Sequence, residues 1–268
     1  MARNIHPTAV IHKTAKVGKG TIIGPYAVIE KNVVLGPGCR IEPFVHIKKD
    51  VIMGAGNHVH SYACIGGEPQ HLGYKGEDTR VEIGDNNIFR ECVTIHRGTA
   101  QGHGKTTIGS GCLLMAYAHV AHDCTVGNRV IMANSVNLAG HVEVGDCAVI
   151  SGMAAVQQWL KIGEYAFLGG ASGYNLDIPP YMLAHGVRGK LFGPNLIGLK
   201  RHGFTTKACQ GLKKAYRIIF RSGLGKEEAL ARVESELPGI PEVGRLLAFI
   251  RESKNGVAPA SSKNGNGE

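Results

Sequence analysis

The stretch from Ile108 to Val126, IGSGCLLMAYAHVAHDCTV, carries an aliphatic side chain at every sixth position. The same spacing continues to Leu168, and it also runs through an earlier stretch: Ile11, Val17, Ile23, Ile29, Leu35, Ile41, Ile47, Met53, Val59 and Ile65. A period of six matches neither the 3.6-residue period of a helix nor the two-residue alternation of an independent strand. The sequence therefore predicts a solenoid made of repeated coils.

Two further positions of the repeat are also restricted. Glycine or a polar residue usually follows the aliphatic, as at Gly109 and Gly127, and a small residue usually stands four places after it, as at Cys112 and Ala118. We expect glycine to allow the backbone angles of tight corners, and small side chains to fit the narrow axis of a three-sided prism. The pattern predicts an all-β parallel β-helix with about 18 residues per coil, each strand stacking about 4.8 Å above its equivalent.

The repeat indicates a β-helix domain over residues 1–190, with two loops near 67–80 and 97–107 where the pattern is lost. Insertions in a solenoid project outward and often form binding sites. We expect the coil to end at Pro179-Pro180, because proline cannot donate to the ladder. A small α-helical C-terminal domain is predicted over 191–254, with helices near 193–202, 205–221, 226–237 and 241–253 and Thr205 as an N-cap. Residues 255–268 are expected to be a disordered tail.

Composition narrows the class of protein. The chain has 268 residues and a net charge of +9, which fits either an acidic partner or a solvated basic surface. Lys and Arg form no stripe in the repeats, so we expect no nucleic acid partner. The seven cysteines include no CxxC pair, which is typical of reduced thiols in a cytoplasmic protein. No apolar run approaches twenty residues, so we expect no integral membrane segment.

Histidines gather on one face of the predicted prism. His122, Gly140 and Gln158 are spaced eighteen residues apart, so coils in register place them in a column with steps of about 5 Å. His119 precedes the same turn, and His141 adjoins the column. If the second loop is a simple bulge, His96 lies one coil below.

This column could supply acid–base chemistry. One imidazole can act as a general base near neutral pH, and the backbone N–H of Gly140 can stabilise an oxyanion. Asp123 could orient the His122 ring, although this requires a backbone bend because side chains alternate along a strand. The rival interpretation is catalytic zinc held by His119, His122 and His141. A non-catalytic β-helix scaffold is the third interpretation.

Several longer motifs resemble a known family. They are Thr79–Asp85 (TRVEIGD), Val93–Thr99 (VTIHRGT), Ala118–Asn128 (AHVAHDCTVGN), Leu138–Val142 (LAGHV) and Gly198–Arg201 (GLKR). Together with Pro179-Pro-Tyr181 they resemble the UDP-N-acetylglucosamine O-acyltransferases that begin lipid A synthesis, within the hexapeptide-repeat acyltransferases. The resemblance implies a left-handed β-helix, a homotrimer with sites between neighbouring prisms, and no metal or nucleotide cofactor.

The resemblance also implies a reaction and its residues. His122 would deprotonate the sugar 3-hydroxyl, which attacks the thioester of a (3-hydroxy)acyl chain on acyl carrier protein; Asp123 would orient His122, and the Gly140 amide would hold the oxyanion. The implied substrate-binding residues are Gln70, His96, His119, His141, Gln158, Gly170, Asn195 and Arg201. Among them Asn195 and Arg201 would meet the uridine and diphosphate of UDP-N-acetylglucosamine, and Gly170 lies where the family gauges acyl length. Basic helix residues Lys213, Lys214 and Arg217 could dock the acidic carrier protein.

The chain departs from the family pattern at His71, Gly73, Gln157, Ile197 and His202. These changes cluster around the expected sugar nucleotide, so acyl transfer to a 3-amino sugar stays open as an alternative. Acetyl-coenzyme A-dependent relatives also remain alternatives. The related N-acyltransferases normally carry an extra N-terminal domain, whereas the repeat here begins at Ile5, which argues against them.

Overall fold

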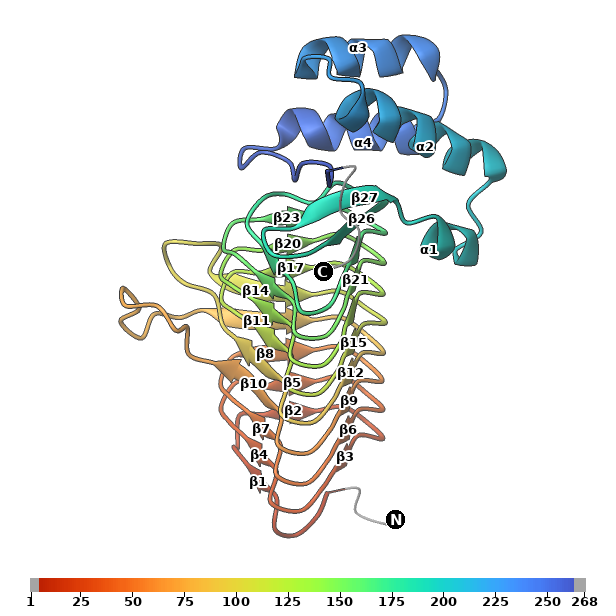
Figure 1. Ribbon diagram of the computed structural model, residues 1–268. Coiled ribbons are helices and arrows are strands. Elements are labelled where there is room, and N and C mark those ends of the chain that lie inside the picture. The colour runs from red at the N-terminus through yellow and green to blue at the C-terminus, as the bar shows by residue number, and fades with distance from the viewer. Residues whose placement is uncertain (1–4, 263–268) are drawn as a thin grey trace.

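The computed structural model describes residues 5–262 as a prism of parallel β-strands with helices packed at its C-terminal end (Figure 1). Each coil contributes one short strand to each of three sheets, which we number 1, 2 and 3 in chain order. Most strand partners lie eighteen residues apart, as in the pairing of Val10 with Val28 and of Thr107 with Thr125. The predicted left-handed β-helix followed by a small helical region is confirmed.

The strands are mostly two residues long. Sheet 1 contains β1 (Val10–Ile11), β4 (Val28–Ile29), β7 (His46–Ile47), β10 (Cys64–Gly67), β13 (Thr94–His96), β16 (His119–Val120), β19 (Asn137–Leu138), β22 (Ala155–Val156) and β25 (Gly173–Tyr174). Sheet 2 contains β2 (Lys16–Val17), β5 (Val34–Leu35), β8 (Val51–Met53), β11 (Arg80–Ile83), β14 (Lys105–Ile108), β17 (Thr125–Val126), β20 (Glu143–Val144) and β23 (Lys161–Ile162). Sheet 3 contains β3 (Ile22–Ile23), β6 (Arg40–Ile41), β9 (His58–Val59), β12 (Ile88–Phe89), β15 (Leu113–Leu114), β18 (Ile131–Met132), β21 (Val149–Ile150), β24 (Phe167–Leu168), β26 (Met182–His185) and β27 (Lys190–Pro194).

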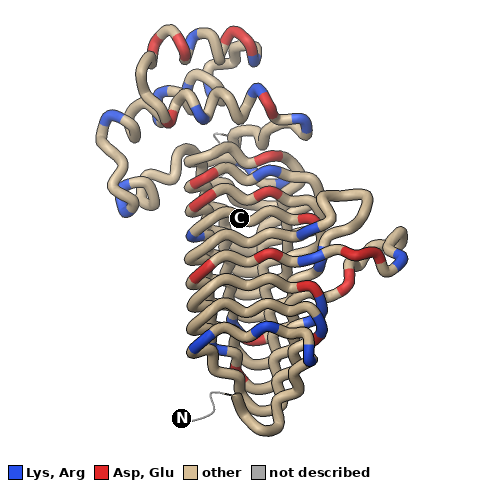
Figure 2. The backbone as a smooth tube through the Cα atoms, turned by 180° about the vertical axis from the view of Figure 1, so that it is seen from behind, with Lys and Arg blue, Asp and Glu red and all other residues tan. Residues whose placement is uncertain are grey.

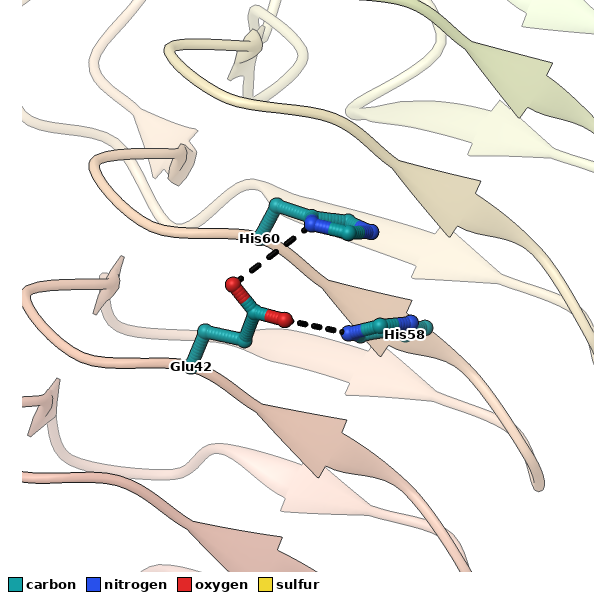
Figure 3. Close-up of side chains that lie close together, drawn as sticks. All are labelled: Glu42, His58 and His60. Atoms are coloured by element: carbon teal, nitrogen blue, oxygen red, sulfur yellow. Dashed lines mark hydrogen bonds and ion pairs between the residues drawn. The ribbon is translucent and has the colours of Figure 1, made fainter.

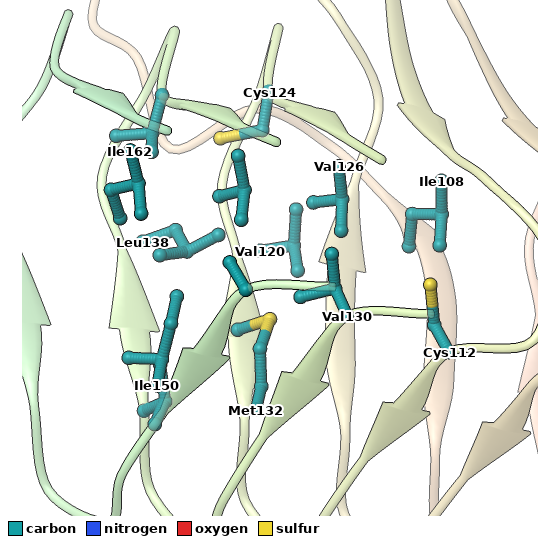
Figure 4. Packing of buried hydrophobic residues seen from close by; sticks show 14 of the residues in the cluster. Ile108, Cys112, Val120, Cys124, Val126, Val130, Met132, Leu138, Ile150 and Ile162 are labelled. Atoms are coloured by element: carbon teal, nitrogen blue, oxygen red, sulfur yellow. The ribbon is translucent and has the colours of Figure 1, made fainter. Parts of the chain in front are cut away.

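The aliphatic residues of the six-residue repeat form the core of the prism. Their side chains point inward and stack from coil to coil, as Val120 and Leu138 do in sheet 1 and Met132 and Ile150 do in sheet 3 (Figure 4). Small residues fill the corners, and Cys112 and Cys124 each donate a weak hydrogen bond to a carbonyl of the next coil, at 3.1 Å. Burial raises the pKa of Cys124 to about 12, so this thiol is an inert packing group.

Glycine is required after the aliphatic residues for a different reason from the one predicted. Gly18 and Gly109 do not have positive φ; a Cβ on Gly18 would lie 2.5 Å from the backbone carbon of Gly36 in the next coil. Glycine is needed there because stacked backbones approach closely. The left-handed corner residues are mostly not glycine, and they include Asp123 (φ 61°) and His141 (φ 63°).

Both predicted loops are present. Cys64 pairs with Thr94 across the first loop, and Thr94 pairs with His119 across the second, so the sequence separation of paired residues exceeds eighteen at both loops. The first loop projects from the prism (Figure 1). The buried Arg97 guanidinium fixes the first loop, donating to the Gly66 carbonyl at 2.6 Å and to the Tyr74 hydroxyl at 2.9 Å. The loops are therefore tied to the coils that they interrupt.

The expectation that Pro179-Pro180 ends the coil is wrong. Strand β26 still pairs in parallel with β24, and only β27 turns back antiparallel. Pro180 occupies the first corner position, which also holds Pro25 and Pro43, and the N–H of that position takes no part in the ladder. Proline is therefore tolerated at the corner rather than ending the stack.

Four helices follow: α1 (Leu196–Arg201), α2 (Thr206–Arg221), α3 (Lys226–Glu236) and α4 (Pro241–Glu252). The Thr205 N-cap is confirmed, because its side chain accepts a hydrogen bond from Ala208 N–H. Disorder from residue 255 is contradicted as far as residue 262, since Val257 pairs with Asp177 and Ala260 with Leu191; residues 263–268 lie outside the described part. None of the described helices has the length and apolar character needed to cross a membrane.

Candidate active site

The predicted histidine column is assembled at the edge of sheet 1 that leads into sheet 2. Strand β13 pairs with β16, with Ile95 opposite Val120, so the second loop is a bulge and His96 lies one coil below that of His119, as predicted. The two rings meet edge to face with centroids 4.8 Å apart. The His141 N–H donates to the His122 carbonyl, and the Trp159 N–H donates to the Gly140 carbonyl, so His122, Gly140 and Gln158 occupy equivalent positions in successive coils.

The His122 ring is held by the carboxylate of the next residue. His122 Nδ1 lies 2.9 Å from Asp123 Oδ2, and only 8% of the His122 residue is exposed. The backbone bend that the sequence required is the left-handed conformation of Asp123, which turns its side chain back toward the ring. With Nδ1 engaged by a carboxylate, Nε2 is the ring atom left to exchange a proton.

The second loop surrounds the Asp123 carboxylate with donors. Thr99 donates from its backbone N–H at 3.0 Å and from its hydroxyl at 2.7 Å, and His103 donates from its N–H at 2.9 Å. Burial raises the pKa of Asp123, but the hydrogen bonds from Thr99 and His122 outweigh burial and hold this pKa below its usual range. Gly102 packs so closely on this carboxylate that a Cβ would overlap it. Asp123 is therefore a fixed anion.

Gly140 lies directly against the reactive edge of His122. A Cβ on Gly140 would be 2.6 Å from His122 Cε1 and 2.8 Å from Nε2, so only glycine fits. Among the described residues, no backbone or side-chain acceptor is hydrogen-bonded to the Gly140 N–H. The corner position it occupies is the one that holds Pro25 and Pro180 elsewhere, which explains why the ladder leaves its N–H free. A free amide beside a base suits an oxyanion.

Three of the surrounding histidines have lowered pKa values. Burial lowers the pKa of His96 to about 4 and lowers the pKa values of His119 and His141. The His141 ring stacks on Trp159, with centroids 3.6 Å apart and planes 4° from parallel, while Gln158 is exposed at the column's upper end. The site therefore places His122 beside three imidazoles whose surroundings disfavour the charged form.

Within one chain, the trio of His119, His122 and His141 proposed for zinc is not assembled. The His119 Nδ1 is hydrogen-bonded to the Thr94 hydroxyl at 2.8 Å, and the group whose ligand atoms lie within 4.8 Å of one another is His122, Asp123 and His141. His141 Nε2 lies 3.8 Å from the same Asp123 oxygen that holds His122. This set contains the predicted base and the residue that orients it.

A second candidate binding region lies on sheet 3, on a different face of the prism. A cavity of about 520 Å³ there is lined by Tyr165, Asn195, Ile197, Arg201 and His202, among others. Asn195 is the N-cap of α1. Its side-chain Oδ1 accepts a hydrogen bond from the Gly198 N–H at 3.1 Å, and its side-chain Nδ2 donates to the Tyr165 carbonyl at 3.1 Å. Within one chain, the residues predicted to meet the nucleotide are thus separated from His122.

The comparisons with known proteins agree with the motifs. A family model described as UDP N-acetylglucosamine O-acyltransferase, domain 2, matches residues 177–258, and a bacterial transferase hexapeptide model matches 32–67 and 105–140. A curated acyl-[acyl-carrier-protein]–UDP-N-acetylglucosamine O-acyltransferase of Anaeromyxobacter sp. (strain K) is 50% identical over 253 residues, covering 94% of this chain and 98% of the relative. The chain belongs to the UDP-N-acetylglucosamine O-acyltransferase family.

Solved structures of the family have the same fold. A UDP-N-acetylglucosamine acyltransferase from Bacteroides fragilis superposes with a TM-score of 0.92 at 41% identity, covering 94% of this chain and 98% of that one. An Arabidopsis UDP-N-acetylglucosamine acyltransferase has a TM-score of 0.83 at 38% identity, with coverage of 95% and 99%. The resemblance seen in the sequence is confirmed, and the protein is an acyltransferase rather than a scaffold.

Two further residues predicted to bind substrate in this O-acyltransferase, Gln70 and Gly170, lie outside the histidine column. Gln70 is exposed in the first loop, whereas its neighbour His71 places its ring centroid 5.3 Å from that of His122. Gly170 lies at the opposite edge of sheet 1, where a Cβ would meet the Gly152 carbonyl at 3.0 Å. One departure from the family pattern, His71, therefore lies beside the base.

Sequence reasoning missed the residues that hold Asp123. Two of them, Thr99 and His103, belong to the second loop. The third is Thr106 in the following strand, β14, and its hydroxyl accepts a hydrogen bond from the Asp123 N–H at 2.9 Å. Register arithmetic fails inside an insertion, because the loop has no partner eighteen residues away. The available signal was Thr99 at the end of the VTIHRGT motif.

Proposed function

We propose that this enzyme transfers a (3-hydroxy)acyl chain from acyl carrier protein to the 3-hydroxyl of UDP-N-acetylglucosamine, with His122 as general base. This reaction is the first step of lipid A biosynthesis. The observation that carries the proposal is the arrangement of His122 between the Asp123 carboxylate and the free Gly140 N–H. The O-acyltransferase names of the relatives support a hydroxyl acceptor over a 3-amino group.

The steps follow from these three groups. His122 Nε2 takes the proton of the 3-hydroxyl as its oxygen attacks the thioester carbonyl, because an alcohol is a poor nucleophile at neutral pH. Asp123 stabilises the imidazolium that forms. The Gly140 N–H donates to the oxyanion of the tetrahedral intermediate. Collapse breaks the carbon–sulfur bond, and the proton on His122 passes to the departing thiolate.

The direct test measures thiol release from hydroxyacyl-carrier proteins with UDP-N-acetylglucosamine, comparing the native enzyme with His122→Ala. Loss of the general base is expected to lower kcat by about 10² or more. Supplying acetyl-coenzyme A in parallel tests the donor class. A His122→Ala variant with near-native kcat would refute the assignment.

We also propose that the enzyme is a homotrimer whose site is shared between chains. The outward side chains of sheet 3 form an apolar row that continues over six strands: Ile88, Leu113, Ile131, Val149, Phe167 and Leu183. Sheet 2 presents Glu82, Glu143 and Lys161 at the corresponding positions. An apolar row of this length supports a subunit interface along sheet 3.

A shared site would bring Asn195 and Arg201 of one chain to His122 of the next. The guanidinium of Arg201 would then bind the diphosphate, for which its planar donors are suited. Mixing His122→Ala with Arg201→Ala chains tests this. Random assembly would restore both groups in about a quarter of the clefts, so activity should rise well above that of either parent. Activity no higher than the mean of the parents would contradict a shared site.

We propose that the basic surface of α2 docks the acyl carrier protein. Lys213, Arg217 and Arg221 line a cavity together with Phe192 and Tyr216, while Lys214 is already paired with Glu236 at 2.6 Å. Acidic side chains are interspersed elsewhere on the helices (Figure 2). The variant Lys213→Glu/Arg217→Glu is expected to raise KM for the acyl-carrier protein, whereas Lys214→Glu should have a smaller effect. An unchanged KM in the double variant would remove this proposal.

The seven cysteines are all free thiols in the structure, which supports a reducing compartment. We therefore place the enzyme in the cytoplasm.

A further inference from the structure

Outside the active site, two histidines and one glutamate converge on sheet 3 near the N-terminal end of the prism (Figure 3). Glu42 follows β6, and His58 and His60 belong to the next coil, at β9 and just after it. His58 Nε2 lies 2.8 Å from Glu42 Oε1, and His60 Nδ1 lies 3.5 Å from Glu42 Oε2. The two rings stack with centroids 4.0 Å apart, and both direct a nitrogen toward the same carboxylate.

The spacing of these atoms suits a tetrahedral cation. Zinc bonds to nitrogen and oxygen of about 2.0–2.1 Å give ligand atoms about 3.4 Å apart. His60 Nδ1 is 3.5 Å from Glu42 Oε2 and 3.6 Å from Glu91 Oε1, a carboxylate of the third coil. The contact between His58 and Glu42 is shorter, and a cation would replace this hydrogen bond. The group thus offers two imidazoles and a carboxylate, with Glu91 or water as a fourth ligand.

The surroundings of Glu42 and of His60 lower both of their pKa values. Burial raises the pKa of Glu42, but its hydrogen bond with His58 and the nearby His60 leave this pKa below the usual value. Burial and the neighbouring His58 lower the pKa of His60. The opposing cations are Arg40, 3.9 Å from Glu42, and Arg90, which pairs with Glu91 at 3.1 Å.

The prism contains a natural comparison for this group. Glu30 and His46 repeat the arrangement on sheet 1, with His46 Nε2 2.7 Å from Glu30 Oε1, and Lys48 stands where the second histidine would be. A glutamate–histidine pair at the same sequence separation therefore occurs without a second imidazole. A protonated lysine cannot act as a ligand, so the Glu30 group is a hydrogen-bonded pair only.

We propose that Glu42, His58 and His60 form a binding site for a borderline divalent cation such as Zn²⁺, separate from the catalytic column. Borderline cations prefer imidazole with carboxylate, whereas Mg²⁺ and Ca²⁺ prefer oxygen ligands alone. The three ligands and Glu91 belong to three successive coils, so the bound cation clamps these coils together. Within one chain this site is separate from the catalytic column, because β6 and β9 lie in sheet 3 and His122 follows β16 of sheet 1.

Binding is tested with the full chain, stripped of metal by chelator and titrated with ZnCl₂ by calorimetry, and with CoCl₂ by visible absorption. We expect one equivalent per chain that His58→Ala and His60→Gln each weaken by more than about 10²-fold, since even outer-shell changes cost 10–100-fold. His46→Ala should leave the affinity unchanged. At a hundredfold excess over Kd, Zn²⁺ should raise Tm by about 5 °C or more.

A gain of binding provides the second test and does not depend on destabilised variants. Lys48→His would give the Glu30 group its missing imidazole, and the stoichiometry is expected to rise from one to two. The proposal is overturned if no Zn²⁺ binds. It is equally overturned if the single equivalent survives both His58→Ala and His60→Gln, or if it is lost in His141→Ala instead, which would assign it to the catalytic cluster.

Discussion

Replacing Asp123 with asparagine tests how the base is oriented. Asparagine keeps the size of the side chain but exchanges one acceptor oxygen for an NH₂ donor. At Oδ1 the new donor would oppose the N–H groups of Thr99 and His103, which are fixed by the backbone. At Oδ2 it would oppose one fixed N–H group, that of Thr99 at 3.0 Å. Its other neighbours there can adapt: the Thr99 hydroxyl can rotate, and His122 Nδ1 can lose its proton. We therefore expect the amide nitrogen to replace Oδ2.

This arrangement forces the wrong tautomer on the base. His122 must accept a hydrogen bond at Nδ1 and carry its proton on Nε2, where it can no longer take the proton of the substrate hydroxyl. The imidazolium also loses its anionic neighbour. General-base catalysis is worth about 10²–10⁴ in rate, so kcat should fall by that factor, or about 3–5 kcal/mol in the activation free energy.

The assay is steady-state release of carrier-protein thiol at saturating UDP-N-acetylglucosamine, with Tm measured on the same samples. KM should change little, because Asp123 is fully buried and does not reach the substrate. Asp146→Asn is the matched control: Asp146 accepts from the backbone N–H of Asn128 at a different corner, and its loss should leave kcat unchanged. If Asp123 acts only through His122, the double variant His122→Ala/Asp123→Asn loses no more activity than His122→Ala. A kcat within tenfold of native, or strictly multiplicative losses, would refute the reasoning.

Three further predictions concern neighbouring positions. Gly140→Ala places a methyl group 2.6 Å from His122 Cε1, so kcat should fall by about 10² or more while circular dichroism shows an intact fold. A variant with kcat within threefold of native would show that the amide can move. Because the pKa of His96 is lowered to about 4, the free energy of unfolding should decrease as pH falls from about 6.5 to 4. The full pKa difference corresponds to roughly 3 kcal/mol, and we expect about 1–2 kcal/mol after solvent screening. Urea unfolding of His96→Gln should lack this component, and a pH dependence identical to that of the native protein would contradict it. Gly170→Met should shift kcat/KM toward shorter acyl donors, by about fourfold per methylene excluded, and an unchanged chain-length profile would show that Gly170 does not limit the acyl site.

The period of six was sufficient to predict the coil, and register arithmetic was sufficient to place His122 beside Gly140. Both follow from the ladder, which repeats every eighteen residues except at the two loops and in the last coil, where Phe167 pairs with Leu183. The environment of Asp123 could not be predicted in this way, because Thr99 and His103 lie in an insertion whose path is set by tertiary contacts. The tail at Val257 was misjudged for a similar reason: its polar composition is typical of disorder, but pairing with Asp177 orders it.

The corner position explains why the catalytic groups occur where they do. Its N–H is free of the ladder, so the position accepts proline at Pro25, histidine at His122 and glycine at Gly140 without a change in fold. The residue after it adopts left-handed backbone angles and turns its side chain back along the corner, as Asp123 does. One coil thus supplies a base with its carboxylate, and the next supplies an unpaired amide one strand spacing away, about 4.8 Å. A solenoid corner can therefore form an acyl-transfer site by substitution alone, provided that an inserted loop surrounds the carboxylate with donors.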